Sequence, residues 1–417
     1  ISEVIANAYQ EAEASKQGAS FVSVPQDVTD AEVKTSVIAP LEPPKLGPAS
    51  PIESTLLSQR IKAAKLPVLL LGMRASDPET TRAIRRLIAE THLPVVETFQ
   101  GAGIIPRELE DDFFGRVGLF RNQPGDQLLK KSDLVIAIGY DPIEYEPRNW
   151  NSDRSANIVV IDSMRAEIDK NYQPERELVG DISQTLDFLL PYMKGYSMPN
   201  ESKEYLDSLR KTLQKRDTPP AVTKDQVKSH PLSIIQALQD RVTDDMTVTV
   251  DVGSFYIWMA RHFRSYEPRH LLFSNGMQTL GVALPWAVAA ALVRPNTKIV
   301  SVSGDGGFMF SSQDLETAVR LGLNIVHIIW NDGNYDMVKF QEELKYGDSA
   351  AVKFGPVDFV KYAESFGAKG YRVEKAADLD KILDKAFKED GPTVVDIPVD
   401  YSFNQELGKT ILEDQLH

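Results

Sequence analysis

The stretch KIVSVSGDGGFMFSSQDLETAVRLGLNIVHIIWNDGNYDM, residues 298–337, decides the fold of the C-terminal part of the chain. Two apolar runs, KIVSVS and NIVHIIW, each end at an acidic residue beside glycine, GDG at 304–306 and NDG at 331–333. Both runs have the length and turn-residue boundaries of strands, and a segment of helical character separates them. Because strands that alternate with helices form parallel sheets, the stretch predicts two neighbouring strands of an α/β fold.

The same alternation continues on both sides of this stretch. A helix is predicted at 232–242, and the nearly apolar run VALPWAVAAALV (282–293) is interpreted as a buried core helix, since a bilayer span needs about 20 residues. The further strands predicted in this block are MTVTVDVG (246–253), HLLFSN (270–275), KGYRVE (369–374) and TVVDIPVD (393–400). We interpret residues 231–417 as one doubly wound α/β domain.

An earlier block, residues 41–192, has the same organisation. Asp77-Pro78 predicts the start of a helix that runs through Ile88. The strands predicted here are LPVLLLGM (66–73), LPVVETF (93–99), SDLVIAIGY (132–140) and ANIVVIDS (156–163). Their continuous apolar character is typical of a parallel sheet covered on both faces. A nicotinamide or flavin fold is one interpretation, but LLLGM has one glycine where a dinucleotide fingerprint has three, so we favour a structural α/β domain.

Two segments lie outside these blocks. Residues 2–16 have helical periodicity and FVSVPQDV (21–28) resembles a short strand, which together are too little to bury a core. We therefore interpret residues 1–40 as the tail of another domain and a linker, with the proline-rich stretch 39–51 marking a boundary. The polar segment 193–230, with a predicted helix at 202–215, is interpreted as a connector. The expected fold class is α/β, with two doubly wound parallel-sheet domains and the tail of a third.

The ends of four predicted strands carry the candidate site. In an open α/β sheet ligands bind at the carboxyl ends of the strands, and here these ends are DVGSF (251–255), SNGMQTLG (274–281), GDGG and NDGN. Glycine allows a backbone to approach a ligand closely, and free amides at a helix start attract an anion. Asp305 and Asp332 are expected to lie together, where two carboxylates repel unless a cation separates them. Either motif alone is typical of a turn or a helix cap, but the pair predicts a magnesium ion that holds a diphosphate.

Composition and charge exclude several classes of function. The 417 residues have a formal net charge of −14, which argues against nonspecific nucleic-acid binding. The absence of cysteine excludes disulfides and thiolate metal sites, and none of the six histidines forms an HxH or HxxxH pair, so a zinc site is not expected. The chain opens at Ile1 without a signal-peptide pattern or membrane span, and we expect it to be cytoplasmic and a fragment of something longer.

The motifs resemble a known family. GDG followed after about 25–30 residues by N-[ND] is similar to the metal and diphosphate signature of thiamine diphosphate enzymes. FVSVPQDV, SNGMQTLGVALPWAVAAAL, IIWNDGNYDMVKFQ and FVKYAESFGAKGYRV resemble acetolactate synthases of the catabolic, flavin-independent bacterial branch, and this resemblance covers essentially the whole chain. It implies an order of pyrimidine-binding, middle and diphosphate-binding domains, of which the first is mostly missing here. The family's catalytic glutamate lies in that first domain, so no glutamate of this chain is assigned to its role.

The resemblance also implies roles for individual residues. Magnesium would be bound by the carboxylates of Asp305 and Asp332 and by the backbone carbonyl of Asn334. Gln341 stands where the biosynthetic branch commonly has tryptophan, which implies a pocket that prefers pyruvate, although a solvated helix position would also explain it. Leu280 would support the bent form of the cofactor, and core packing is its alternative explanation. The other implied cofactor contacts are Gly253, Ser254, Phe255, Gln278, Thr279, Gly306 and Gly307.

The implied activity is that of acetolactate synthase. Pyruvate would be decarboxylated on thiamine diphosphate, with Mg²⁺, and the two-carbon unit joined to a second pyruvate to give 2-acetolactate and CO₂. FAD is not expected to be required, and the full-length enzyme would be a homodimer or homotetramer that acts in acetoin or branched-chain amino acid formation. This chain alone would be inactive if the glutamate-bearing domain is missing. The alternatives are another thiamine diphosphate-dependent 2-oxo acid decarboxylase or oxidase, and a non-catalytic cofactor-binding fragment.

Overall fold

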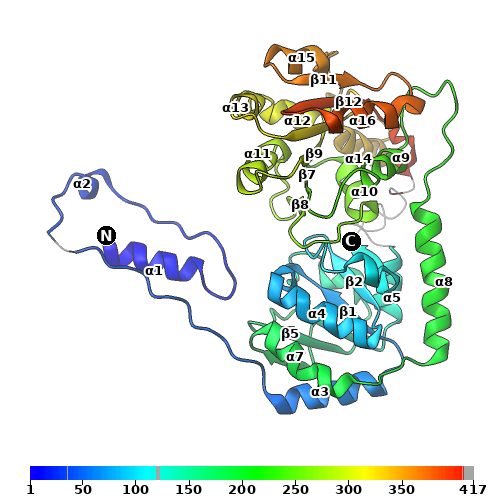
Figure 1. The fold of residues 1–417 in the computed structure, drawn as a ribbon. Coiled ribbons are helices and arrows are strands. Elements are labelled where there is room, and N and C mark those ends of the chain that lie inside the picture. Colours follow the sequence, from blue (N-terminus) through cyan, green and yellow to red (C-terminus); the bar gives the residue numbers. More distant parts are fainter. Residues whose placement is uncertain (35, 119–122, 406, 408–417) are drawn as a thin grey trace.

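A computed structural model describes residues 1–34, 36–118, 123–405 and 407. It contains two six-stranded sheets, each with helices between its strands, and every strand pair in both sheets is parallel. The two sheets belong to separate bodies that lie one above the other in Figure 1. The predicted α/β fold class is therefore confirmed.

The first sheet has the strand order β3-β2-β1-β4-β5-β6. Its strands are β1 (Pro67–Leu71), β2 (Val95–Thr98), β3 (Phe113–Val117), β4 (Leu134–Ile138), β5 (Ile158–Asp162) and β6 (Arg176–Val179). Four of them were predicted, whereas β3 and β6 were missed. Their sequences, FFGRV and RELV, contain glycine or charged residues and lack the apolar run of a strand buried on both faces. Both are edge strands. β6 is only partly buried along its edge, whereas β3 is buried throughout although its sequence includes a glycine and an arginine.

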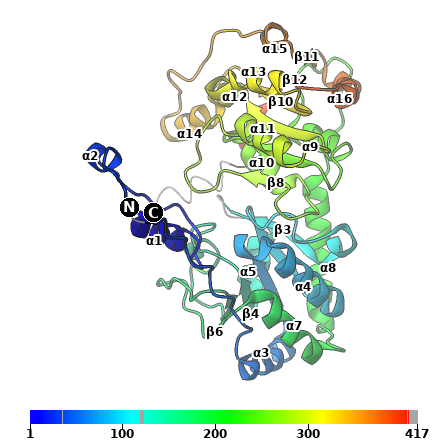
Figure 2. The same ribbon diagram turned by 60° about the vertical axis from the view of Figure 1, so that its left-hand side comes forward.

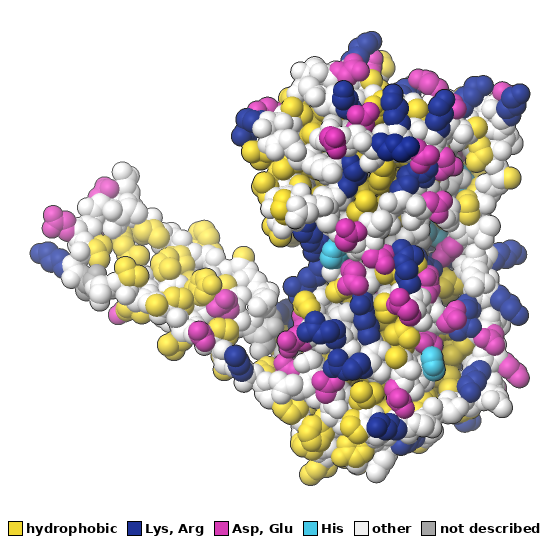
Figure 3. All heavy atoms as spheres, in the orientation of Figure 1, with side chains coloured by type: hydrophobic (Ala, Val, Ile, Leu, Met, Phe, Trp, Pro, Cys, Tyr) yellow, Lys and Arg dark blue, Asp and Glu magenta, His cyan; other side chains and the backbone are white. Residues whose placement is uncertain are grey.

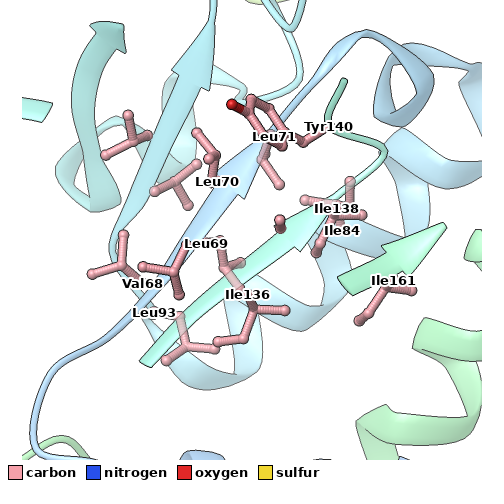
Figure 4. Close-up of a cluster of buried hydrophobic side chains, with 14 of the residues drawn as sticks. Val68, Leu69, Leu70, Leu71, Ile84, Leu93, Ile136, Ile138, Tyr140 and Ile161 are labelled. Carbon is pink, nitrogen blue, oxygen red and sulfur yellow. The ribbon is translucent and has the colours of Figure 1, made fainter. Parts of the chain in front are cut away.

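The core of this body is built from the central strands and the helices that cover them. Figure 4 shows Val68, Leu69, Leu70 and Leu71 of β1 among apolar side chains of the neighbouring strands and of one helix. The helices are α3 (Pro51–Ala63), α4 (Pro78–Thr91), α5 (Pro124–Lys131), α6 (Pro147–Trp150) and α7 (Ile182–Met193), with short 3₁₀ helices η1 (Met73–Ser76) and η2 (Arg107–Asp112). Asp77 caps α4 as its position before proline predicts, because its carboxylate accepts from the amides of Glu79 and Thr80.

The second sheet has the order β11-β12-β10-β9-β7-β8. Its strands are β7 (Thr247–Val250), β8 (Leu271–Phe273), β9 (Ile299–Gly304), β10 (Ile325–Asn331), β11 (Lys369–Arg372) and β12 (Thr393–Pro398), all within predicted strands. The helices are α9 (Pro231–Gln239), α10 (Ser254–His262), α11 (Ala283–Val293), α12 (Asp305–Ser311), α13 (Asp314–Arg320), α14 (Asp336–Tyr346), α15 (Phe359–Ser365) and α16 (Leu379–Lys388), with η3 (Ala376–Asp378) and η4 (Tyr401–Asn404). The strands β9 and β10 are direct neighbours, so the two acidic motifs that follow them share one edge of the sheet.

Helix α8 (Asn200–Asp217) joins the two bodies and runs beside both of them in Figure 1. It lies in the segment interpreted as a connector, and the helix predicted at 202–215 forms nearly as expected. Arg210 of α8 donates to the carbonyl of Asp111 in the first body, and Arg216 donates to the carbonyl of Arg261 in the second. The connector is therefore a packed element that contacts both bodies. The domain boundaries assigned from the sequence stay predictions.

Three sequence predictions need correction. The helix predicted at 2–16 is shorter, α1 (Ser2–Ala12). The short strand predicted within 21–28, ending at Pro25, is wrong: residues 21–25 pair with no described strand, and the short helix α2 (Gln26–Thr29) follows them. A strand needs a neighbour for its backbone groups, and the part of the N-terminal segment around α2 projects from the first body in Figures 1 and 2. The segment contacts that body at Lys16, which forms ion pairs with Asp141 and Glu167. Helix α11 forms, but only one face is buried, with Leu292 and Val293 56% and 78% exposed.

The N-terminal segment carries many exposed apolar side chains. They are visible as the yellow atoms on the projecting arm in Figure 3, and include Val4, Ile5, Tyr9 and Phe21.

None of the helices in the described part of the chain has the length and apolar character needed to cross a bilayer.

The buried His327 of β10 leads to a prediction about stability and pH. Its two ring nitrogens lie 2.9 and 2.8 Å from the hydroxyl oxygens of Ser301 and Ser303 on β9, and burial lowers its pKa to about 3. A histidine whose folded pKa is depressed stabilises the fold above its unfolded pKa of about 6.5, and this stability is lost as the pH falls toward the folded pKa. Between pH 6 and 4 the free energy of unfolding should thus fall by about 1.4 kcal/mol per pH unit through this group.

His327→Gln removes this titration and leaves a side chain that can still bond to the serines. We expect the variant to be less stable than the parent at pH 7.5 and to lose less stability between pH 6 and 4. Urea unfolding at half-unit pH steps measures both slopes. Parallel slopes for the two proteins would show that His327 does not stay neutral in the folded chain.

Candidate active site at the edge of the second sheet

The candidate site lies where β9 and β10 end. The pairing of Trp330 with Gly304 brings the two strand ends into register, and Asp305 and Asp332 follow directly. Here a pocket of about 200 Å³ opens between α10, α12, the loop after β10 and η4. The side chains and backbone that line it belong to Val252, Gly253, Ser254, Phe255, Leu280, Gly304, Asp305, Gly306, Gly307, Trp330, Asp332, Asn334, Tyr335, Asp336, Met337, Val338 and Tyr401.

Asp305 connects the two acidic motifs. Its carboxylate accepts one hydrogen bond from the amide of Gly306 at 2.9 Å and another from the amide of Gly333 at 2.7 Å. Burial, and then the negative charge of Asp332, raise the pKa of Asp305 to about 7. The carboxylate of Asp332 is thus close enough to oppose the ionisation of Asp305, an effect that a cation between them would relieve.

The loop after β10 presents the other oxygen donors. The side-chain amide of Asn334 donates to the carbonyl of Asp332 at 2.8 Å and to its carboxylate at 3.0 Å, and burial raises the pKa of that carboxyl group. An isolated bridge between Asn334 and Lys353, and a bond from the amide of Tyr335 to the carbonyl of Val352, hold the loop in place. Among the described residues no group of three or more His, Cys, Asp or Glu side chains could hold a metal. A cation here would depend on two carboxylates, a backbone carbonyl and oxygen atoms from a ligand, a set that suits Mg²⁺.

The first turn of α10 faces the same pocket. Gly253 precedes the helix at φ 155°, ψ −171°, a backbone region that is essentially restricted to glycine. The amides at the start of an α-helix have no acceptor within the helix, and Gly253, Ser254 and Phe255 supply them here. On the other side of the pocket, a Cβ added to Gly306 would lie 2.7 Å from the ring of Tyr335. The pocket thus has the first amides of α10 on one wall, where the backbone of Phe255 interacts with the hydroxyl of Tyr401, and carboxylates on the other.

Two aspartates that the sequence analysis did not single out support this geometry. Asp336, in the first turn of α14, accepts from the hydroxyl of Ser254 and, at 2.7 Å, from the side-chain amide of Asn404. Burial raises its pKa to about 7. Asp251, at the end of β7, accepts from the amides of Val252, Gly281 and Ala283 and so joins the DVGSF and GMQTLG segments.

Sequence signals for these two residues existed, because Asp251 opens the quoted DVGSF stretch and Asp336 follows NDGN after Tyr335. The sequence could not show which residues donate hydrogen bonds to these two aspartates. Tyr401 stacks with Trp330 in the lining of the pocket and follows the last strand of the sheet. No motif in the sequence marked it as a site residue.

The remaining predicted site residues are placed differently. Leu280 lines the pocket, whereas Gln278 and Thr279 lie outside its lining, with Gln278 half-buried at φ 49° and Thr279 exposed. Gln341 is exposed on α14 and also lies outside the lining. The described chain brings together nine of the implied cofactor contacts, Gly253, Ser254, Phe255, Leu280, Asp305, Gly306, Gly307, Asp332 and Asn334.

Comparison with known proteins agrees with this geometry. The family model described as the C-terminal TPP binding domain of thiamine pyrophosphate enzymes matches residues 251–397, and the model of their central domain matches residues 55–189. The chain is 49% identical over 407 residues to the acetolactate synthase of Bacillus subtilis strain 168, covering 98% of this chain and 71% of that protein.

Two further relatives define the breadth of the family. The catabolic acetolactate synthase of Raoultella terrigena is 46% identical over 418 residues, which cover 100% of this chain and 74% of that protein. A putative thiamine pyrophosphate-containing protein of Bacillus subtilis, YdaP, is 30% identical over 393 residues, which cover 92% and 66%. The chain belongs to the acetolactate synthases, within the thiamine pyrophosphate-dependent enzymes.

Proposed function

We propose that the protein catalyses the acetolactate synthase reaction, in which one pyruvate loses CO₂ and its two-carbon unit joins a second pyruvate to give 2-acetolactate. The observation that supports this most strongly is the pocket that is lined by Asp305, Asp332 and the first residues of α10. The match of residues 251–397 to the TPP binding domain of the family supports thiamine diphosphate as the ligand.

The polar wall of the pocket would bind the diphosphate through magnesium. Asp305, Asp332 and the carbonyl of Asn334 would be the protein ligands of Mg²⁺, which normally completes its shell with phosphate and water oxygens. The amides of Gly253, Ser254 and Phe255 would donate to the diphosphate, because a helix N-terminus favours negative charge. These local devices matter since the chain as a whole carries a formal net charge of −14.

The apolar wall would orient the rest of the cofactor and exclude water. Leu280, Met337 and Val338 line it, and the side chain of Leu280 would support the bent form of the bound molecule. When bound, the thiazolium ring supplies the electron sink for loss of CO₂. A dry, apolar surround favours loss of a carboxylate charge, so the contribution of these side chains is positioning and desolvation.

We propose that the middle domain needs no FAD. The carboxyl edge of its sheet, where a dinucleotide would lie in this strand order, is occupied by its own side chains. Arg74 donates to Asp141 at 2.9 Å and to Asp162 at 2.7 Å, and Glu144 accepts from the amide of Met73 and the hydroxyl of Thr98. A Cβ on Gly72 would lie 2.4 Å from the backbone of Tyr140, which leaves no room for a ligand at this glycine.

We further propose that the enzyme is cytoplasmic and works as a homodimer or homotetramer.

Product analysis tests the proposed function. The protein, together with the glutamate-bearing N-terminal domain that the family resemblance implies, is incubated with thiamine diphosphate, Mg²⁺ and pyruvate, and the products are identified by NMR with and without phosphate. Acetolactate with release of one CO₂ per two pyruvates is the expected outcome. Acetyl phosphate or free acetaldehyde would instead indicate the alternative function, an oxidase or a decarboxylase that uses the same cofactor. Cofactor binding without any turnover of pyruvate would indicate a binding function.

A further inference from the structure

Helix α10 extends from the cofactor pocket to the interface with the middle domain. Its first residues line the pocket, and all nine of its residues are buried. At about 1.5 Å per residue the helix is about 13 Å long. A rigid helix of this length transmits any shift of its C-terminal end to the amides at its N-terminal end.

The C-terminal end of α10 is bound by arginines from outside its own domain. One terminal nitrogen of Arg116, on β3 of the middle domain, donates to the carbonyl of Ala260 at 3.0 Å and to that of Phe263 at 2.7 Å. Arg216 of the connector helix donates to the carbonyl of Arg261 at 3.1 Å. These carbonyls lie at the C-terminal end of α10. The last carbonyls of an α-helix have no amide partner within the helix, and the helix dipole favours a cation beside them.

Arg116 is itself fixed by the middle sheet. Its side chain is 1% exposed, and its Nε lies 3.4 Å from a carboxylate oxygen of Glu97, the residue paired with it across β2 and β3. Glu97 also accepts from the amide of Ile105 at 3.1 Å. Burial lowers the pKa of Arg116 to about 10, so the guanidinium stays charged at neutral pH. The guanidinium therefore has one defined position relative to the sheet, and the end of α10 is bonded to it.

We propose that Arg116 is a positioning residue of the cofactor site: through α10, the middle domain sets where the amides of Gly253, Ser254 and Phe255 stand. This gives the middle domain a function in cofactor binding that requires no ligand of its own. The inference rests on the proposed diphosphate role of these amides. Arg216 holds the same turn from the connector and adds to the effect.

The test compares variants of two interface arginines. Glu97→Gln with Arg116→Met removes both bonds to α10 without leaving a buried carboxylate alone. Arg85→Met is the matched control, because Arg85 also crosses the interface, to the carbonyl of Tyr266, but does not bond to α10. Arg116→Lys keeps a charge and a donor. Each protein is titrated with thiamine diphosphate at saturating Mg²⁺ by calorimetry, its thermal unfolding is followed without cofactor, and its rate with pyruvate is measured.

We expect the Glu97→Gln/Arg116→Met protein to bind thiamine diphosphate about tenfold more weakly, the lower end of the effect of removing an outer supporting contact. Its kcat at saturating cofactor should stay within a few-fold of the parent. Arg116→Lys should be intermediate, and Arg85→Met should lose thermal stability but keep the parent's cofactor affinity. If the double variant does not fold, Arg116→Lys and Arg216→Met give the same comparison with Arg85→Met.

Two results would overturn the inference. One is parental affinity in the Arg116 and Arg216 variants; the other is an equal loss of affinity in Arg85→Met, which would show a general effect of loosening the interface. Failure of the proposed function has a different signature, since the parent protein itself would then not bind thiamine diphosphate in the presence of Mg²⁺.

Discussion

Replacement of Asp305 by alanine is expected to abolish the magnesium-dependent binding of thiamine diphosphate. Asp305 contacts both acidic motifs, through the amides of Gly306 and Gly333, and it lines the pocket as a proposed metal ligand. Loss of a supporting contact around a metal costs about 10–100-fold in affinity, so loss of a ligand should cost at least about 100-fold. Calorimetric titration with thiamine diphosphate, with and without Mg²⁺, measures the effect.

Two companion variants make this result specific. Asp305→Asn keeps the size and one oxygen but removes the charge, so it should also lose magnesium dependence. Asp348→Ala removes an exposed carboxylate from the loop after α14 and should bind like the parent. The magnesium assignment would be wrong if the parent bound thiamine diphosphate equally well without Mg²⁺, or if Asp305→Ala retained the dependence.

The sequence was sufficient for the fold because the central strands of both sheets are unbroken apolar runs. Residues 67–71 and 325–330 are buried throughout, and their short length and β-branched or leucine-rich composition between turns favour strands over helices. The edge strand β6 was not predictable in this way, since RELV has no apolar pattern and forms because β5 offers it a free edge. The error for 21–28 has the opposite cause: a strand-like sequence has no sheet edge beside it among the described residues.

The site was predictable to the extent that it follows from strand ends. Asp305 and Asp332 meet because adjacent parallel strands end at one edge, which holds for any sequence that forms β9 and β10. The bond from Ser254 to Asp336 joins residues 82 positions apart, and that from Arg116 to Ala260 joins residues 144 apart. Contacts between residues so far apart produce no periodic pattern in the sequence. The structure was therefore needed to show which polar side chains stabilise the pocket.

Gly253→Ala is expected to weaken thiamine diphosphate binding at least about tenfold, which corresponds to about 1.4 kcal/mol. At φ 155°, ψ −171° an alanine backbone is strained by about 1–3 kcal/mol. A Cβ there would also lie 2.6 Å from the ring of Phe255. Relief of either strain moves the first turn of α10, and with it the amides proposed to bind the diphosphate. Calorimetry at saturating Mg²⁺ gives the affinity, and thermal unfolding gives the accompanying loss of stability.

Gly391→Ala is the matched control for this substitution. Gly391 also has a positive φ, 83°, but no described atom lies within 4 Å of the position its Cβ would take. The substitution introduces backbone strain in a loop that is distant in sequence from α10. The unfolding temperature of this variant should therefore be a few degrees lower, whereas its affinity for thiamine diphosphate should equal that of the parent. A Gly253→Ala protein that unfolds early but keeps the parent's affinity would show that the start of α10 stabilises the domain without contacting the diphosphate. Loss of affinity in Gly253→Ala alone would place the diphosphate at these amides.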